Sequence, residues 1–305
     1  MKDCAFLFPG QGSQTIGMGK DLYDKTEFGK KIFKMADDVL GYHLSKICFE
    51  GPEQELKLTY NTQPALLTVS YILYNLFGKE PLIAAGHSLG EYSALLCAES
   101  IKFEDAVTLV HKRGNYMQDA VPVGKGAMAA IIGANIEMVR KTVSEVNGIV
   151  NLANWNSSSQ IVISGEKEAV EEAVEKISAP KSIFLPVSAP FHSELMLPAQ
   201  RKLAHDLRNI EFKSLKFPVV NNVEAKETID GEETREALIK QVTSPVLWYS
   251  TMIKFLQEMK IYKYVEIGTG KVLTGLLKRT ARELQIEVEI MNIQALDDIK
   301  NIQIT

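Results

Sequence analysis

Short apolar runs alternate with amphipathic stretches along the first 120 residues. Residues 4–8 (CAFLF) form an uninterrupted apolar run, which predicts a strand buried on both faces, and a second run at residues 82–85 leads into a glycine-rich turn. Helices are expected over residues 64–77, with Pro64 as the first helical residue, and over residues 91–98 and 103–120. This alternation predicts an α/β fold with a parallel sheet.

The pattern changes near residues 122–126, where proline and glycine are concentrated. From there to residue 187 the expected elements run strand, helix, strand, strand, helix, strand, which is the ferredoxin-like βαββαβ unit. Further strands are expected at residues 218–221 and 264–267. We therefore predict an α/β-hydrolase-like large domain made of residues 1–124 and 189–305, with a ferredoxin-like small subdomain inserted at residues 125–188.

Composition and charge indicate an ordinary globular protein. Apolar residues make up 46% of the chain and charged residues 24%, which excludes a disordered, collagen-like or coiled-coil chain. The net charge of −4 argues against a general nucleic-acid binder. No apolar run of the sequence reaches membrane-spanning length, and no secretory signal is expected. The three cysteines are scattered and suit buried, reduced side chains (Cys4, Cys48, Cys97). We therefore expect a soluble cytoplasmic protein.

The clearest chemical motif is Gly86-His87-Ser88-Leu89-Gly90, which fits G-x-S-x-G. It lies between a predicted buried strand and a predicted helix, as this motif requires. The flanking glycines allow a tight turn that exposes the Ser88 hydroxyl, and the Leu89 N–H would point to the space where an oxyanion forms. We interpret Ser88 as a nucleophile, whereas the alternative is a glycine-rich turn with a solvated serine.

A serine nucleophile needs a base, and the chain has five histidines. His192 lies in a proline-rich loop where the inserted unit rejoins the large domain, so it is the best-placed candidate. His87 adjoins the serine and is expected to shape the turn. The other three fall in helical patterns with charged neighbours and are expected at the surface (His43, His111, His205).

Arg113 falls on the apolar stripe of the helix predicted at residues 103–120. A charge on an apolar face is costly unless it is paired. An internal salt bridge to an Asp or Glu is one explanation. The other is a guanidinium that binds a substrate carboxylate through two hydrogen bonds, which beside an acylating serine would indicate a dicarboxylic half-thioester as acyl donor.

Two nucleotide-binding motifs are only approximated. Thr15 replaces the third glycine of G-x-G-x-x-G in the loop that starts at Gly10. The Gly268-Thr269-Gly270-Lys271 segment lacks both the opening glycine of a P-loop and the Ser or Thr after the lysine. No His or carboxylate spacing indicates a metal site, so no metal and no resident cofactor are expected.

With these residues placed, the chain resembles the malonyl-CoA:acyl carrier protein transacylase family over nearly its whole length. The resemblance rests on nine ordered segments, namely FPGQGSQ (8–14), TQPALLT (62–68), GHSLGEYSAL (86–95), RGNYMQ (113–118), GAMAAIIG (126–133), NWNS (154–157), PFHS (190–193), VVNNV (219–223) and GTGKVLTGL (268–276).

The resemblance implies a ping-pong malonyl transfer from malonyl-CoA to the phosphopantetheine thiol of acyl carrier protein, for fatty acid biosynthesis. Ser88 would attack the thioester, His192 would take the proton, and the backbone carbonyl of Gln241 would orient the histidine. Gln11 and Leu89 would donate their backbone N–H groups to the oxyanion. The positions that match substrate contacts in the family are Arg113, Met117, Asn154, Asn156, Phe191 and His87.

The resemblance also implies partners and a substrate preference. The acyl carrier protein would be acidic, and Lys271, Lys278 and Arg279 are candidates for a basic patch that receives it; neither a nucleic acid nor a membrane is expected as partner, and the protein is expected to be a monomer. Phe191 would occupy the space of a 2-methyl group, which favours malonyl over methylmalonyl.

Two other functions are weighed against this one. A serine hydrolase shares G-x-S-x-G but ordinarily follows the order Ser, acid, His, and it gives no reason for Arg113. A non-enzymatic scaffold that binds carrier protein would keep the fold with an inactive site. Loss of acyl transfer on Ser88→Ala distinguishes the enzyme from the scaffold.

Overall fold

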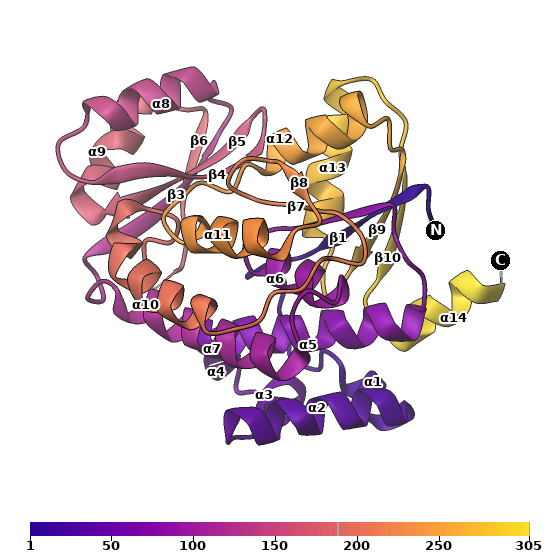
Figure 1. Ribbon diagram of the computed structural model, residues 1–305. Helices are drawn as coiled ribbons and strands as arrows, with labels where there is room; N and C mark the ends of the chain where they lie inside the picture. The colour runs from indigo at the N-terminus through magenta and orange to yellow at the C-terminus, as the bar shows by residue number, and fades with distance from the viewer. Residues whose placement is uncertain (188, 305) are drawn as a thin grey trace.

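A computed structural model describes residues 1–187 and 189–304 of the chain (Figure 1). Its larger sheet has the strand order β10-β9-β1-β2-β7-β8. Neighbouring strands are parallel except for the antiparallel pair β7 and β8. The strands are β1 (Cys4–Phe8), β2 (Ile83–Gly86), β7 (Val219–Val220), β8 (Glu227–Thr228), β9 (Lys263–Ile267) and β10 (Glu289–Ile293).

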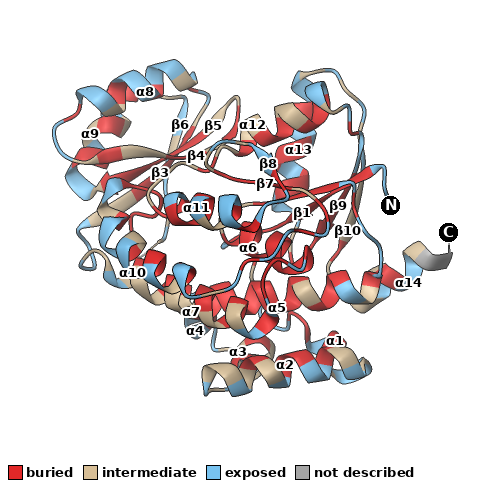
Figure 2. Cartoon of the chain, viewed as in Figure 1, coloured by how far each residue is buried: buried red, intermediate tan, exposed pale blue. Residues whose placement is uncertain are grey.

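The central strand β1 explains why its sequence is apolar throughout. Cys4, Phe6 and Phe8 pack into one hydrophobic cluster, while Ala5 and Leu7 pack into a second cluster on the other face. The first cluster is covered by helices such as α5 (Thr59–Phe77) and α7 (Phe103–Asp119), the second by α12 (Trp248–Ile253) and α13 (Val272–Glu283). Helices on both faces leave no side of the strand for polar residues, and Figure 2 shows these central strands as buried.

Helices connect the strands of the large sheet, and several follow one another directly, as α1 to α5 do between β1 and β2. The helices are α1 (Lys20–Lys25), α2 (Glu27–Leu40), α3 (Leu44–Glu50), α4 (Glu53–Lys57), α5 (Thr59–Phe77), α6 (Leu89–Cys97), α7 (Phe103–Asp119), α8 (Ile136–Glu145), α9 (Lys167–Ile177), α10 (Leu197–Arg208), α11 (Gly231–Gln241), α12 (Trp248–Ile253), α13 (Val272–Glu283) and α14 (Leu296–Ile304), with a 3₁₀ turn η1 (Glu194–Met196) and a π-helical turn η2 (Lys254–Glu258).

The smaller sheet is antiparallel and has the order β4-β5-β3-β6. Helices α8 and α9 pack on it around a separate hydrophobic cluster, at the upper left of Figure 1. This order of strands is the ferredoxin-like arrangement expected from the sequence, so the fold class is confirmed. The strands are β3 (Gly126–Ile132), β4 (Val150–Ser157), β5 (Gln160–Glu166) and β6 (Lys181–Phe184).

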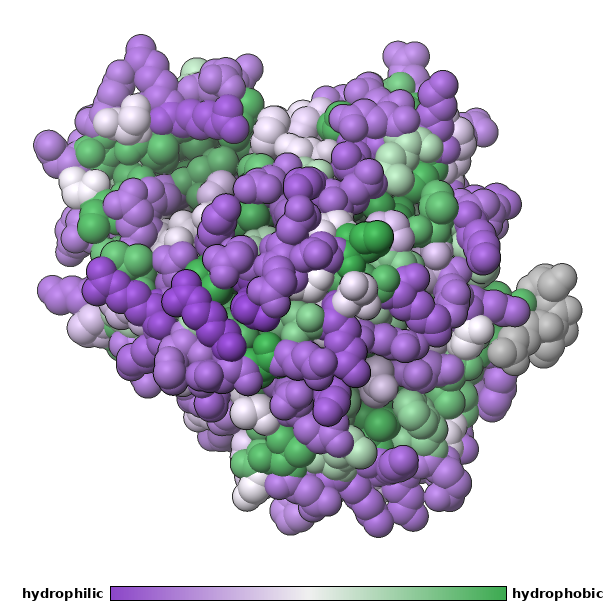
Figure 3. Space-filling model, in the orientation of Figure 1, coloured by the Kyte–Doolittle hydropathy of each residue, from purple (hydrophilic) through white to green (hydrophobic). Residues whose placement is uncertain are grey.

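The edge strand β6 leaves apolar side chains at the surface. Ile183 and Phe184 are both exposed. In Figure 3 this face of the molecule is mostly hydrophilic, with hydrophobic patches near the small sheet and also at the right and the bottom of the view.

The prediction that Pro64 begins a helix is wrong. Helix α5 starts at Thr59, and Pro64 lies inside it. Because proline has no N–H, it cannot donate to the carbonyl of Tyr60, four residues earlier. His111 Nδ1, 2.9 Å from that carbonyl oxygen, supplies the missing hydrogen bond. His111 is therefore partly buried and structural, rather than the surface residue we expected.

The cysteine prediction is confirmed, and one strand was missed. All three cysteines are free and buried, as expected (Cys4, Cys48, Cys97). Strand β10 was not predicted, because it lies at the edge of the sheet and its side chains are mostly half-buried, so no apolar run marks it.

Candidate active site

The turn between β2 and α6 holds Ser88 in an unusual backbone conformation, with φ 52° and ψ −106°. This positive φ is costly for a residue with a side chain and is typical of strained functional turns. Both flanking glycines are required by close packing. A Cβ on Gly86 would lie 1.9 Å from the Gly90 carbonyl, and a Cβ on Gly90 would lie 2.0 Å from the Phe8 carbonyl oxygen. The turn therefore has the form of a nucleophile elbow.

His192 lies directly against the serine. Its Nε2 is 2.8 Å from the Ser88 Oγ, and its Nδ1 is 2.9 Å from the backbone carbonyl oxygen of Gln241. A carbonyl oxygen only accepts, so Nδ1 carries the proton and Nε2 presents a lone pair to the serine hydroxyl. The imidazole is thus held in the tautomer that a general base needs.

Burial keeps His192 neutral. Removal from water, followed by the positive charge of Arg113, lowers the pKa of His192 to about 3. The hydrogen bond to the Gln241 carbonyl works in the opposite direction but is outweighed. The imidazole is therefore unprotonated over the whole neutral range.

Arg113 is buried, with 1% of its surface exposed. Its Nη2 donates to the Ser88 Oγ at 3.1 Å and to the Gln241 Oε1 at 2.9 Å, and its Nη1 donates to the Gln63 Oε1 at 2.7 Å. None of the carboxylates in the described part of the chain forms a salt bridge with it. All three acceptors are neutral, so the guanidinium retains a positive charge that an anion could neutralise.

These side chains meet at a cavity of about 130 Å³. Ser88, in the turn between β2 and α6, and Arg113, on α7, belong to the large sheet and its helices, while Met128 and Asn154 come from the small sheet. The full lining is Gln11, Gln63, His87, Ser88, Leu89, Arg113, Met117, Met128, Asn154, Leu185, Val187, Phe191 and His192.

Most of the residues singled out from the sequence lie at this cavity. Leu89 is the first residue of α6, where backbone N–H groups have no acceptor within the helix, and Gln11 lines the cavity as well. Asn156 differs, because it is absent from the lining. Its Oδ1 lies 2.9 Å from His87 Nε2, behind the histidine, so it holds that ring instead.

Three buried residues of the site were missed by the sequence analysis. Gln63 is an acceptor for Arg113. Asn222 accepts from the Ser88 N–H at 2.7 Å and donates to the Gly86 carbonyl at 2.7 Å, which fastens the turn. Glu91 lies in the first turn of α6 and is 2% exposed. A single carboxyl in the otherwise apolar or small-residue segment that follows Ser88 was the one available signal for Glu91.

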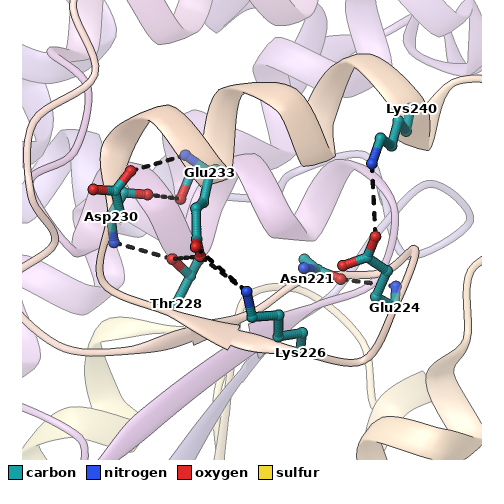
Figure 4. A network of polar contacts seen from close by, with 8 residues as sticks. Asn221, Glu224, Lys226, Thr228, Asp230, Glu233 and Lys240 are labelled. Atoms are coloured by element: carbon teal, nitrogen blue, oxygen red, sulfur yellow. Dashed lines mark hydrogen bonds and ion pairs between the residues drawn. The ribbon is translucent and has the colours of Figure 1, made fainter.

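A network of polar contacts joins the connection between β7 and β8 to helix α11 (Figure 4). Asp230 caps α11 by accepting from the Glu233 N–H at 2.9 Å, a contact that stabilises a helix by about 1 kcal/mol. Lys226 and Lys240 pair with carboxylates of Glu233 and Glu224, which joins the β7–β8 connection to α11. Helix α11 ends at Gln241, the residue whose backbone carbonyl accepts from His192.

The candidate basic residues lie away from the cavity lining. Arg279 of α13 donates to the Gln160 Oε1 at 3.1 Å, on the small sheet. In residues 1–187 and 189–304, no group of three His, Cys, Asp or Glu side chains is arranged to hold a metal ion. Among the described helices, none has both the length and the apolar character that crossing a membrane requires.

Comparison with known proteins places this geometry in a family. The sequence model of the acyl transferase domain matches residues 5–302. A malonyl CoA-acyl carrier protein transacylase of Bacillus subtilis is 47% identical over 294 residues, which cover 93% of this chain and 92% of the relative. The chain belongs to the malonyl-CoA:acyl carrier protein transacylase family.

Solved structures agree with this membership. An acyl carrier protein S-malonyltransferase from Vibrio cholerae superposes with a TM-score of 0.93 at 40% identity, covering 98% of this chain and 99% of the other. A malonyl-transacylase in complex with its type II polyketide acyl-carrier protein gives a TM-score of 0.92 at 43% identity, with 97% of each chain covered. As a member of this transacylase family, the protein is an acyltransferase enzyme.

Proposed function

We propose that this acyltransferase moves a malonyl group from malonyl-CoA to the phosphopantetheine thiol of an acyl carrier protein, through a malonyl-serine intermediate. The observation that carries the proposal is the position of Arg113, a buried cation without a described carboxylate partner, 3.1 Å from the Ser88 Oγ. A serine hydrolase for neutral esters has no use for such a charge. The names of the relatives point to the same substrates.

In the first half-reaction, the Ser88 Oγ attacks the thioester carbonyl carbon while His192 Nε2 takes the hydroxyl proton. The backbone N–H groups of Leu89 and Gln11 donate to the oxygen that becomes negative. The C–S bond then breaks, and coenzyme A leaves with the proton held by His192. The malonyl group remains on Ser88 as an ester.

In the second half-reaction, the phosphopantetheine thiol gives its proton to His192 Nε2 and its sulfur attacks the malonyl ester. The C–O bond to Ser88 breaks and the serine oxygen recovers the proton, which leaves the malonyl thioester on the carrier protein. Gln241 supports both halves, because its carbonyl keeps the His192 Nδ1 proton in place. No resident cofactor takes part in either step.

Arg113 binds the malonyl carboxylate in this proposal, since its planar guanidinium can donate two parallel hydrogen bonds. Met117, Asn154 and Phe191 line the space for the rest of the acyl group. His87, held by Asn156, forms part of the cavity wall next to the nucleophile. Phe191 limits the room for a 2-methyl substituent.

The acceptor is an acidic carrier protein in this account. Lys271, Lys278 and Arg279 remain its proposed basic contacts, at some remove from the cavity lining. A rate of the second half-reaction that falls with salt would support them, and a salt-independent rate would contradict them. We further expect the protein to act as a monomer in the cytoplasm, supplying malonyl units for fatty acid synthesis.

Intact mass spectrometry after mixing with malonyl-CoA tests the proposal. One malonyl adduct is expected, peptide mapping should place it on Ser88, and Ser88→Ala should abolish it. An adduct that survives until carrier protein is added indicates a transferase. Release of coenzyme A without an accumulating adduct and without acceptor would indicate a hydrolase. Unchanged transfer by Ser88→Ala would refute Ser88 as the nucleophile.

A further inference from the structure

Glu91 is a buried carboxyl group at the active site that the proposed mechanism does not use. One of its oxygens, Oε2, accepts from the Gln241 Nε2 at 2.8 Å and from the Asn222 backbone N–H at 3.0 Å. It has no salt-bridge partner among the described residues. Burial raises the pKa of Glu91 to about 7, although the hydrogen bonds from Gln241 and Asn222 act in the opposite direction. In either protonation state a carboxyl oxygen can accept both hydrogen bonds.

The contacts of Glu91 determine how the Gln241 side chain is oriented. Besides Glu91, the Gln241 Nε2 faces the Ser88 carbonyl oxygen at 3.1 Å and the Asn222 Oδ1 at 3.4 Å. All three neighbours are acceptors, so the amide nitrogen must point toward them. The Gln241 Oε1 is thereby turned to the opposite side, where it accepts from Arg113 Nη2 at 2.9 Å.

We propose that Glu91 is a positioning residue for malonyl transfer. Its carboxyl group fixes the Gln241 side-chain amide, so that the amide oxygen holds Arg113 beside Ser88. Glu91 itself touches neither Ser88 nor Arg113 by a hydrogen bond. It acts through Gln241, the same residue whose backbone carbonyl orients His192. This inference rests on the proposed function for the identity of the acyl group but not for the activation of Ser88.

The same contacts predict distinct behaviour for two substitutions of Glu91. In Glu91→Gln the new amide oxygen can replace Oε2 and accept both hydrogen bonds. In Glu91→Leu both contacts are lost and the Gln241 amide is free to turn. The substitutions should therefore change how Arg113 is oriented. The measured quantity is the ratio of the single-turnover rates at which malonyl-CoA and acetyl-CoA acylate Ser88.

We expect Glu91→Leu to lower the malonyl-to-acetyl rate ratio by about tenfold and Glu91→Gln to keep it within about threefold of the wild type. Gln241→Leu removes the intermediate link but keeps the backbone carbonyl for His192, so it should lower the ratio as Glu91→Leu does. The double variant should show no further loss, because both substitutions break one connection.

Glu266 provides a matched control. It is also a fully buried carboxyl group, it accepts from the backbone N–H groups of Leu273 and Thr274 at the start of α13, and it is not among the residues that line the cavity. Glu266→Gln should leave the ratio unchanged. Equal loss of malonyl and acetyl rates in folded Glu91→Leu, or additive losses in the double variant, would overturn the proposal. If Glu91→Leu does not fold, an unchanged ratio in Gln241→Leu overturns it.

Labelling of Ser88 with a fluorophosphonate separates this inference from the proposed function. The reagent requires an activated serine but no acyl-CoA. Arg113 donates to the Ser88 Oγ, so Glu91→Leu should slow labelling by about threefold or more, and Glu91→Gln should not. A wild-type protein that reacts with the reagent but not with malonyl-CoA would refute the proposed function alone. Labelling rates equal in wild type and Glu91→Leu would refute the role of Glu91.

Discussion

The Nη2 atom of Arg113 lies 3.1 Å from the Oγ of Ser88, so the cation and the serine hydroxyl share one site. Its other partners, Gln63 and Gln241, accept hydrogen bonds without bringing a negative charge. The internal salt bridge considered from the sequence is absent from the described residues. The structure thus leaves a place for an anionic acyl group next to the serine.

Substitution of Arg113 should change which acyl group is preferred. Losing a buried charge contact costs about 3 kcal/mol, so Arg113→Ala should lower the ratio of kcat/KM for malonyl-CoA to that for acetyl-CoA by about 100-fold. For Arg113→Lys this ratio should lie between those of the wild type and Arg113→Ala, because lysine keeps the charge but cannot donate two parallel hydrogen bonds. Steady-state kinetics with both donors measure this, and an equal drop for both would point to a structural arginine.

The low pKa of His192 predicts an unusual pH profile for acylation. With a value of about 3, the base stays neutral well into the acidic range. The single-turnover rate of Ser88 malonylation should be flat from about pH 8 to about pH 5, whereas an unperturbed histidine would lose about tenfold by pH 5.5. A rate that declines with a midpoint near 6.5 would contradict the prediction.

The same shift affects stability. The unfolded chain binds a proton at a higher pH than the buried imidazole does, so the contribution of His192 to stability is complete above about pH 6.5 and is lost as the pH falls toward 3. His192→Gln should remove this part of the pH dependence. Urea unfolding at a series of pH values compares the two proteins.

Phe191 should favour malonyl over methylmalonyl without excluding the latter. A single methyl group shifts discrimination by about 1–3 kcal/mol, so Phe191→Ala should raise the relative kcat/KM for methylmalonyl-CoA by about tenfold. Val187→Ala enlarges the same cavity at another position and serves as the control. The prediction fails if the wild type uses both donors equally, or if the control gives the same change.

Two glycines should respond in opposite ways to alanine. In Gly90→Ala the new Cβ meets the Phe8 carbonyl oxygen, so we expect a loss of about 3 kcal/mol in the free energy of unfolding, together with loss of activity. Gly275 lies in α13 with no atom within 4 Å of a new Cβ. Gly275→Ala should therefore stabilise the protein by about 0.5–1 kcal/mol. Urea unfolding measures the free energy of unfolding of both variants. A change of the same sign in the two would contradict the packing argument.

The sequence predicts the elements whose cause is local. Strand β1 has the limits expected because its apolar run is complete between Asp3 and Pro9. Helix α5 begins before the expected residue because the hydrogen bond that replaces the one missing at Pro64 comes from His111, which is far away in the sequence. No local pattern carries that information.

In the site, too, features with a local cause can be predicted from the sequence and features that depend on distant contacts cannot. The neighbours of Ser88 are visible as a motif, and Arg113 stands out because a charge interrupts an apolar stripe. Asn222 and Gln63 gave no such signal, since a polar residue in a loop or a helix is ordinary until its partner is known. Their roles arise from contacts 134 and 50 residues away along the chain.

Two parts of the fold form the cavity wall. One part holds the reacting groups, and the other can be altered without moving them. The serine, the imidazole and the guanidinium are fixed by the parallel sheet and its helices, whereas Met128 and Asn154 face them from the ferredoxin-like unit. Redesign of the acyl chain that the enzyme accepts can begin on β3 and β4, where a changed side chain reshapes the far wall and leaves the reacting groups and their tautomer undisturbed.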